Sequence, residues 1–225
     1  MTKNKYLLAL LLVTLLGGFL RFFQLDKFPV SLNWDEVSHG YNAYSILKTG
    51  MDEWGIRFPL IFRAFGDYKL PLYIYLTVLP VKLFGLTPLG VRFISALAGT
   101  LAIPAIYLLA KNLSKSKSFA LIVSFLLAIS TYHIFQSRPA LEANLSLTLV
   151  IAGFALLTRP NSRKLGLFLG GLMLALSLHT YNSARVFVPL MYLFFLVTIS
   201  KEKRLEHLKS SALPLVLGLS IVFFQ

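Results

Sequence analysis

The sequence contains no cysteine and few charged residues, and each absence excludes a class of protein. Zero cysteines among 225 residues exclude a disulfide scaffold, a thiolate metal site and a cysteine nucleophile. Only 14% of the residues are charged and 56% are hydrophobic, whereas a soluble domain is about one quarter charged and about half apolar. So few polar groups cannot cover a water-facing surface, which excludes a soluble globular enzyme. A disordered or fibrous chain is excluded by the same composition.

Acidic residues are scarce and unevenly distributed. The chain has 9 acidic and 22 basic residues, a net charge of +13. Six of the nine acids fall between the first two apolar runs: Asp26, Asp35, Glu36, Asp52, Glu53 and Asp67. The basic residues occupy short gaps between apolar runs, a pattern typical of cytoplasmic loops beside anionic lipid rather than of nucleic-acid binding.

Long apolar runs dominate the rest of the chain and predict an all-α polytopic membrane protein. The runs lie roughly at 6–23, 70–84, 92–110, 119–135, 144–157, 165–178, 185–199 and 211–225. The basic gaps 111–117, 159–164 and 201–209 all fall on the side of the N-terminus, inside, only if the run 70–84 does not cross. That run is short and contains Pro71, Pro80 and Lys82. We therefore expect about seven transmembrane helices in one membrane domain, 1–225. We also expect the chain to be a fragment of a longer protein.

The region 24–91 is then one long outer loop, with amphipathic juxtamembrane helices expected near 33–49 and 70–84. Asn33 with Glu36 three residues later has the spacing of a capping box, and Gly50 suits a helix end. Helical spacing gives this helix an apolar face, consisting of Val37, Tyr41, Tyr44 and Leu47. A polar stripe consists of Asp35, His39 and Asn42. An acid that leads such a stripe is a candidate general base, although acids also favour a first turn because they complement the helix dipole.

Further polar residues lie where other predicted spans meet the same outer surface. Lys69 and Arg92 are each able to hold a phosphate or simply to anchor a helix at the interface. Glu142 is an acid near bilayer depth, and Arg138, four residues earlier, is the partner expected for it in either a structural or an active-site pair. The third element is 179–185, with His179, Tyr181 and Arg185. Sequence motifs for metal or nucleotide phosphate, such as HExxH, DxD and GxxxxGK[ST], are missing.

Taken in order, these short motifs resemble the N-terminal portion of GT-C class glycosyltransferases. The resemblance is to the protein O-mannosyltransferase and aminoarabinose-transferase group, which uses lipid-linked sugars. The matching segments are Trp34-Asp35-Glu36, Tyr68-Lys69-Leu70-Pro71, Phe84-Gly85 with Val91-Arg92-Phe93, Ser137-Arg138 through Leu141-Glu142, and Thr180-Tyr181 through Arg185. The chain departs from the family in having Lys69-Leu70-Pro71 where a basic residue precedes two prolines, and in being roughly half the usual length.

The resemblance implies sugar transfer from a polyprenyl-phosphate donor at the outer membrane face. It implies catalytic roles for Asp35 and Glu36, with an acid as base or as the group that orients the acceptor. It implies binding of substrate and lipid phosphate by Lys69, Arg92, Arg138, Glu142, His179, Tyr181 and Arg185. The implied partners are membrane lipid, the lipid-linked sugar and an acceptor protein, lipid or glycan, with no nucleic acid.

We expect no metal and no other cofactor, because Asp35 and Glu36 point in different helical directions. The expected location is a prokaryotic cytoplasmic membrane, with the active site facing outside. Two other functions remain open from the sequence. Intramembrane acids and arginines also mark transport paths, which would fit a transporter or lipid flippase. The short length would fit a non-catalytic membrane subunit.

Overall fold

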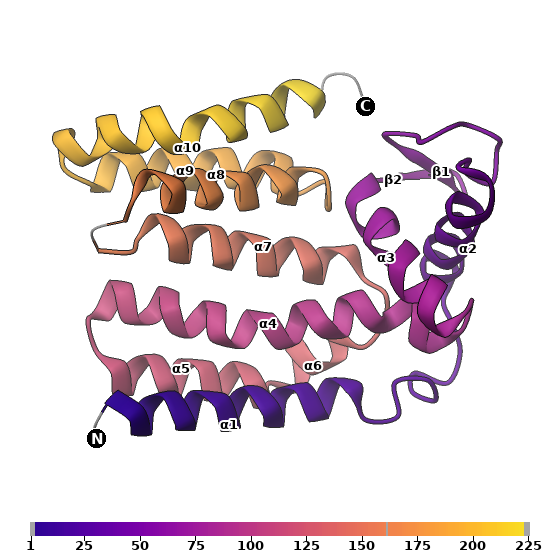
Figure 1. Cartoon of the computed structure of the whole chain (residues 1–225), viewed down its shortest axis with the longest axis horizontal. Coiled ribbons are helices and arrows are strands. Elements are labelled where there is room, and N and C mark those ends of the chain that lie inside the picture. The colour runs from indigo at the N-terminus through magenta and orange to yellow at the C-terminus, as the bar shows by residue number, and fades with distance from the viewer. Residues whose placement is uncertain (1–2, 161, 223–225) are drawn as a thin grey trace.

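The computed structural model describes residues 3–160 and 162–222, and these form a helical bundle with a small cap at one end (Figure 1). The bundle is built from layers of roughly parallel and antiparallel helices. Its helices are α1 (Lys3–Phe22), α4 (Pro88–Ser114), α5 (Lys117–Ile129), α6 (Thr131–Ser137), α7 (Glu142–Leu157), α8 (Lys164–Leu178), α9 (Ala184–Thr198) and α10 (Lys201–Val222). The expected all-α class is thus confirmed for the described residues, apart from one short hairpin.

The two ends of the bundle differ in what they carry. At one end lie the start of α1 and the connections α4–α5, α7–α8 and α9–α10; we call it the basic end (Figure 1). The opposite end carries α2 (Trp34–Thr49), β1 (Phe62–Ala64), β2 (Asp67–Lys69) and α3 (Pro71–Phe84); we call it the cap end. The segment 70–84 therefore lies across the end of the bundle, beside α2, and does not extend along it.

Length and composition identify membrane-spanning candidates within the described residues. α1, α4 and α10 are long and apolar enough to cross a membrane, and α5 with α6 qualifies as one broken span bent by 59°. The bundle helices α7, α8 and α9 are apolar but have only 15 or 16 residues, below the length of about 20 that a span usually needs. The seven expected spans correspond to these seven segments, of which three to four meet the length criterion on their own.

The outer surface of the bundle is apolar, as lipid contact requires. Leu7, Leu11 and Leu15 on α1 are 69%, 53% and 60% exposed. A continuous apolar stripe of this kind is costly in water and favourable in hydrocarbon, where a helix also satisfies its own backbone hydrogen bonds. The exposed stripe therefore supports an integral membrane protein.

Small residues allow the bundle helices to approach closely. A Cβ atom at Gly153 on α7 would lie 3.0 Å from the carbonyl oxygen of Gly170 on α8, and one at Gly170 would lie 3.1 Å from the carbonyl oxygen of Gly153. Only glycine permits this backbone contact, which is the usual way helices associate inside membranes. The buried apolar cluster around it includes Leu157, Leu174 and Leu178.

Local sequence explains how the cap begins. The Asn33 side chain accepts a hydrogen bond from the Glu36 N–H, and the Glu36 carboxylate accepts one from the Asn33 N–H, so the expected capping box is present. Gly50 ends α2 in the left-handed conformation, at φ 70°. α3 begins at Pro71, where proline suits the first helical position.

The hairpin of β1 and β2 is a feature that the sequence did not predict. It pairs Phe62 with Lys69 and Ala64 with Asp67 in antiparallel register. Its two turn residues, Phe65 and Gly66, both have positive φ, as a tight hairpin turn requires. Each strand has three residues and an aromatic residue occupies the first turn position, so the usual Asn-Gly or Asp-Gly signal is absent. The consequence for the site is that β2 delivers Lys69.

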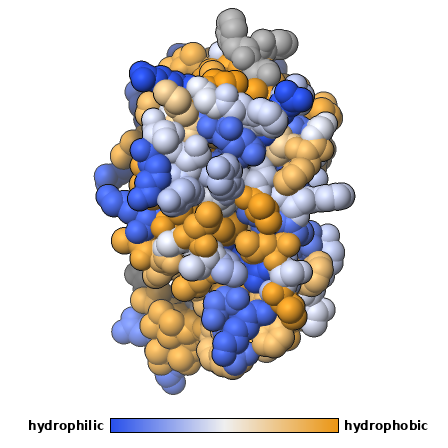
Figure 2. Space-filling view, turned by 90° about the vertical axis from the view of Figure 1, so that its right-hand side faces the viewer, coloured by the Kyte–Doolittle hydropathy of each residue, from blue (hydrophilic) through white to orange (hydrophobic). Residues whose placement is uncertain are grey.

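α2 turns its polar stripe inward and its apolar face outward. His39 and Asn42 are fully buried, whereas Val37, Tyr41 and Tyr44 are 46%, 50% and 37% exposed. Across the surface of the cap end, hydrophobic side chains lie among hydrophilic ones (Figure 2). The polar face of α2 thus belongs to the interior of the protein, where buried polar groups require partners.

Candidate active site

A polar pocket of about 430 Å³ opens at the cap end, where α2, β2, α7 and the α8–α9 connection meet. Five separate segments contribute its walls, because Gln136 on α6 also lines it. The lining residues are Asp35, Asp67, Tyr68, Lys69, Leu70, Gln136, Leu141, Glu142, Ala143, Thr180, Tyr181, Asn182 and Ser183. Among the residues predicted for the site, the structure brings together Asp35, Lys69, Glu142 and Tyr181.

Lys69 lies at the centre of the charged groups in this pocket. Its Nζ is 2.9 Å from Asp35 Oδ1, 3.1 Å from Asp67 Oδ2 and 3.8 Å from Glu142 Oε1. The Lys69 side chain is only 10% exposed, whereas that of Asp67 is 66% exposed. The ammonium therefore bridges two partly shielded carboxylates, one from α2 and one from α7, which are 107 residues apart in the sequence.

The surroundings of Lys69 keep it charged. Burial lowers the pKa of the ammonium, but the hydrogen bonds that it donates to Asp35 and Asp67 and the negative charges of Glu142 and Asp35 outweigh burial and leave the pKa above its usual value. The pKa of Asp67 is lowered by hydrogen bonds from the Tyr68 N–H and from Lys69. At neutral pH the pocket thus contains one positive charge among three acidic side chains.

His39 lies behind Glu142 and has a defined tautomer. Its Nδ1 is 3.1 Å from the carbonyl oxygen of Ala140, and because a carbonyl can only accept, Nδ1 carries the proton. Burial is the main cause that lowers the pKa of His39, so the imidazole is neutral at pH 7 and Nε2 carries a lone pair. Nε2 lies 3.7 Å from Glu142 Oε2, longer than a hydrogen bond. Nε2 is therefore buried beside the Glu142 carboxylate with no hydrogen-bond partner among the described residues.

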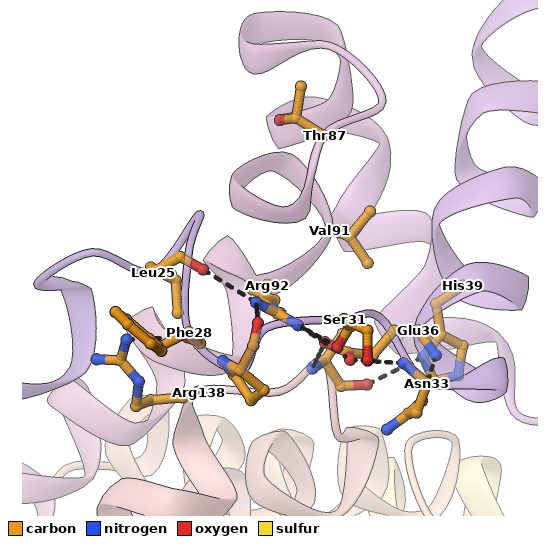
Figure 3. Close-up of polar contacts among 12 residues, drawn as sticks. Leu25, Phe28, Ser31, Asn33, Glu36, His39, Thr87, Val91, Arg92 and Arg138 are labelled. Carbon is orange, nitrogen blue, oxygen red and sulfur yellow. Dashed lines mark hydrogen bonds and ion pairs between the residues drawn. The ribbon is translucent and has the colours of Figure 1, made fainter.

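Glu36 and Arg92 form a buried ion pair outside the pocket (Figure 3). Arg92 Nε donates to Glu36 Oε1 over 2.8 Å, and both side chains are 1% exposed. The other guanidinium donors reach Glu36 Oε2 and the carbonyl oxygens of Leu25, Pro29 and Ser31. All five N–H donors of Arg92 are thus used by the protein itself. Neither residue lines the pocket, and the geometry places both in a structural ion pair. The catalytic role implied for Glu36 and the phosphate-binding role implied for Arg92 stay predictions.

The same pair helps to place Glu142. Glu36 Oε1 also accepts a hydrogen bond of 3.0 Å from the Ala140 N–H, while His39 binds the Ala140 carbonyl. Both polar groups of this one peptide residue are therefore held by α2, which also carries Asp35. The spacing between Asp35 and Glu142 is set by this clamp on the turn before α7.

Arg138 does not pair with Glu142, contrary to the expectation from their spacing. Its guanidinium donates to the carbonyl oxygens at the end of α1 and in the loop after it, namely those of Leu20, Arg21, Gln24 and Phe28. Helix carbonyls at a C-terminus lack partners within the helix, so a cation is favourable there. Glu142 instead has Lys69 and His39 within 4.0 Å.

The predicted residues of the third element separate in the structure. Tyr181 lines the pocket and is 40% exposed. His179 caps the end of α8, and its carbonyl oxygen accepts a hydrogen bond from the Leu72 N–H. Arg185 donates from Nε to the Leu178 carbonyl oxygen over 3.2 Å. His179 and Arg185 are not among the residues that line the pocket.

His39, Asp67 and Asn182 are among the residues at the site that were not predicted as site residues. His39 lies one turn after Asp35, and this i, i+4 spacing is the signal that links them. Asp67 precedes Lys69 by two residues in the hairpin, and Asn182 follows Tyr181. The sequence contains no local sign of the hairpin, so the approach of Asp67 to the pocket could not be inferred.

A comparison with known protein families decides the family of this fold and pocket. A model of the dolichyl-phosphate-mannose-protein mannosyltransferase family matches residues 11–222. The chain belongs to this family. Family membership confirms the resemblance seen in the sequence and agrees with a glycosyltransferase that uses a lipid-linked donor. No curated protein sequence matches the chain.

Solved structures show the same fold for this mannosyltransferase-family chain. The apo oligosaccharyltransferase of Archaeoglobus fulgidus superposes with a TM-score of 0.75 at 16% identity, over 96% of this chain and 29% of that one. The oligosaccharyltransferase AglB of the same organism, in complex with an inhibitory peptide and a dolichol-phosphate, gives a TM-score of 0.72 at 16% identity, over 94% of this chain and 29% of that one. The chain thus spans about three tenths of the length of these structures, and the likeness establishes a GT-C-like fold.

Proposed function

We propose that this chain forms the catalytic end of a membrane glycosyltransferase that moves a sugar from a polyprenyl-phosphate donor to an acceptor. The observation that carries the proposal is the position of Lys69, held between Asp35 and Glu142 in a pocket at one end of a family-typical bundle. Such transfer needs a base for the acceptor and a cation for the leaving phosphate. The pocket contains both kinds of group within 4 Å of one atom, Lys69 Nζ.

The contact between Lys69 and Asp35 suggests an order of events. In the free protein Lys69 neutralises Asp35 over 2.9 Å. A donor phosphate that enters the pocket attracts the ammonium, and this weakens its contact with Asp35 and leaves the carboxylate available as a base. Asp35 takes the proton of the acceptor hydroxyl or amine as the acceptor atom bonds to the anomeric carbon. The bond between that carbon and the phosphate oxygen breaks, and Lys69 stabilises the charge on the departing phosphate.

Glu142 and His39 support this step from the other side of Lys69. Glu142 keeps the ammonium in the pocket when its bond to Asp35 loosens. Neutral His39 lies 3.7 Å from Glu142 and adds no positive charge that would compete with Lys69 for this carboxylate. Glu36, Arg92 and Arg138 act as positioning residues, because their hydrogen bonds hold the backbone that carries Asp35 and Glu142.

The proposal needs no divalent metal. The described residues contain no group of three or more histidine and acidic side chains with the spacing of a metal site. The carboxylates of Asp35, Asp67 and Glu142 all face the ammonium of Lys69, which occupies the place between them. A lysine in this position supplies the positive charge directly. We accordingly expect transfer to be insensitive to EDTA.

The experiment uses the full-length protein in native membranes with a polyprenyl-phosphate sugar, and it measures release of polyprenyl phosphate. Asp35→Asn should lower kcat by about 10²–10⁴-fold, the usual contribution of general base catalysis. Lys69→Gln should lower kcat/KM by about 10²-fold or more, because the phosphate loses its cation. Asp26→Asn is the matched control, since Asp26 is an exposed acid of the same loop outside the pocket, and it should keep full activity.

Release of polyprenyl phosphate at an unchanged rate in Asp35→Asn would refute the role of Asp35 as the base. Substrate movement across the membrane that continues without an acceptor, and does not depend on Asp35, would favour the transporter instead. We propose further that the protein lies in a prokaryotic cytoplasmic membrane, with its N-terminus on the inner side and the pocket on the outer side. Labelling of single cysteines with a membrane-impermeant reagent tests these sides separately from activity.

A further inference from the structure

Two adjoining pockets lie at the basic end, on the opposite side of the bundle from the candidate active site. The first, about 500 Å³, lies where α4 ends, α5 begins and α7 ends. The second, about 550 Å³, extends from there to α9 and α10. Asn112, Lys115, Arg159 and Pro160 line both, so the two form one groove between helices. No part of the proposed sugar-transfer reaction uses this groove.

The first of these pockets contains cations and no acid. Its charged lining residues are Lys111, Lys115, Lys117 and Arg159. None of the four forms an ion pair within 4.0 Å with any other described residue, and Lys117 has only a distant contact, 5.8 Å, with the ring of Tyr6. Four like charges around one cavity repel each other unless an anion lies among them. In the second pocket Lys203 adds another cation and Glu206 the only acid that lines the groove.

Helix dipoles do not account for this arrangement. Lys111 in the last turn of α4, and Lys115 just after it, lie where a helix C-terminus favours cations. Lys117, however, is the first residue of α5, where the N-terminal dipole disfavours a positive charge. The same holds for Lys203 in the first turn of α10. Cations on both kinds of helix end indicate a negative charge that comes from outside the chain.

The groove also has apolar walls and a buried polar atom. Leu108 and Leu156 line the first pocket, and Leu167 and Phe195 line the second. His207, which lines the second pocket, is 7% exposed, and its Nδ1 is buried without a hydrogen-bond partner in the described part of the chain. A cavity of this size with several cations, leucines and an unsatisfied imidazole nitrogen suits a ligand that has an anionic group next to an apolar portion.

We infer that the groove at the basic end binds a phosphate-bearing anion, with Lys115 and Arg159 as its central contacts. A phospholipid headgroup fits best, because basic pockets between membrane helices bind anionic headgroups and Leu108 of the apolar wall is 45% exposed. A soluble phosphate compound has the same anionic chemistry. The proposal is more specific than a general excess of basic residues on one side, because it names residues that line a cavity and excludes equally exposed lysines that do not.

The test compares two double variants of the full chain in detergent. Lys115→Gln with Arg159→Gln removes two groove cations. Lys201→Gln with Lys209→Gln removes two exposed lysines from the same end that line neither pocket. Binding of dioleoylphosphatidylglycerol is measured by native mass spectrometry, with dioleoylphosphatidylcholine as the neutral lipid of equal chains. The groove variant should bind the anionic lipid about tenfold more weakly, and the control within about twofold of the original chain.

Each outcome has a defined meaning. Competition by inorganic phosphate against the anionic lipid would identify the phosphate group alone as the ligand, whereas persistence of lipid binding in phosphate would identify a phospholipid site. Equal weakening in both double variants would show a diffuse surface charge and overturn the proposal. Unchanged binding in the groove variant would overturn it too. Gel filtration and the melting temperature confirm that both variants are folded, which is expected because the substituted side chains are exposed.

Discussion

The two ends of the bundle treat charge in opposite ways. At the cap end, the cations of the site have acidic partners within the protein: Lys69 lies among Asp35, Asp67 and Glu142, and Arg92 is paired with Glu36. At the basic end, four cations line a pocket with no acid among its walls. The charged residues of the cap end are thus held by partners that come from distant parts of the chain. The other end leaves its charges to be neutralised from outside.

This difference separates a reaction site from a contact site. A reacting group must be held in a fixed geometry before substrate arrives, and buried ion pairs with full sets of hydrogen bonds provide that geometry. An anion-binding surface needs only a suitable concentration of charge, because the ligand itself supplies the missing partner. Substitutions should therefore change the free energy of unfolding strongly at the cap end and weakly at the basic end.

The largest effect on stability is expected for Arg92→Met. This change leaves the Glu36 carboxylate buried without its cation, and removal of one partner from a buried pair costs about 3–5 kcal/mol. Thermal unfolding in detergent should show a strongly lowered midpoint or no folded protein. The matched control is Arg57→Met, an exposed arginine of the cap with no ion pair among the described residues, which should stay within about 0.5 kcal/mol. Equal stability of the two variants would refute the buried-pair role.

A smaller loss is expected for Arg138→Gln, and it separates two possible roles. The guanidinium holds four carbonyl oxygens near the end of α1, so its loss should cost about 1–3 kcal/mol of stability. If Arg138 held the lipid phosphate, as the family resemblance implies, KM for the donor would rise instead. We expect an unchanged KM for the donor in steady-state assays at a temperature where the variant remains folded. A raised KM with full stability would restore the phosphate-binding role.

His39 gives the cap end a pH dependence of intermediate size. Burial is the largest cause that lowers the pKa of His39 from its ordinary value of 6.5, and the charge of Lys69 lowers it further. The charges of Glu142 and Asp35 raise the pKa but do not outweigh burial. His39 therefore becomes protonated at a higher pH in the unfolded chain than in the folded chain. The contribution of neutral His39 to the free energy of unfolding is fully present above pH 6.5 and is lost as the pH falls. Between pH 6.5 and 5.5 the original chain should lose about 1 kcal/mol that His39→Gln does not lose. Parallel pH profiles of the two melting temperatures would contradict this expectation.

The smallest effect is expected at the basic end. In the absence of anionic lipid, Lys115→Gln with Arg159→Gln should change the free energy of unfolding by no more than about 0.5 kcal/mol, because no partner is lost within the chain. At low salt the change should be toward higher stability, since repulsion among the cations is relieved. Thermal unfolding at low and high salt measures both. A loss of several kcal/mol would reveal internal partners and remove the contrast between the two ends.

The sequence was sufficient for features that depend on local order. Long apolar runs located the bundle helices, and the spacing of Asn33 and Glu36 predicted the capping box that the structure contains. The basic gaps together with Pro71 and Pro80 separated the run 70–84 from the predicted spans, and in Figure 1 α3 lies at the cap end. Glu142 was recognised as a candidate because an acid near bilayer depth usually has a partner, and Lys69 because a lysine at this position could hold a phosphate.

Partnerships between distant residues could not be read in the same way. Arg138 and Glu142 have the spacing of a helical pair, but Pro139 breaks the helix between them, and the arginine turns to α1 instead. Glu36 and Asp35 were both expected at the site, yet a rotation of about 100° around α2 directs Glu36 to Arg92 and away from the pocket. Family likeness named these residues without distinguishing those that line the pocket from those that support it.

We propose that the cap end and the basic end lie on opposite sides of the membrane, with the pocket outside. The chain has no cysteine, so single substitutions can be labelled without background. Asp67→Cys and Asn182→Cys report on the cap end, and Ser116→Cys and Glu206→Cys report on the basic end. With a membrane-impermeant thiol reagent on intact cells, we predict labelling at 67 and 182, and labelling at 116 and 206 only after lysis. Labelling at 116 or 206 in intact cells, or labelling at 67 or 182 only after lysis, would contradict this arrangement.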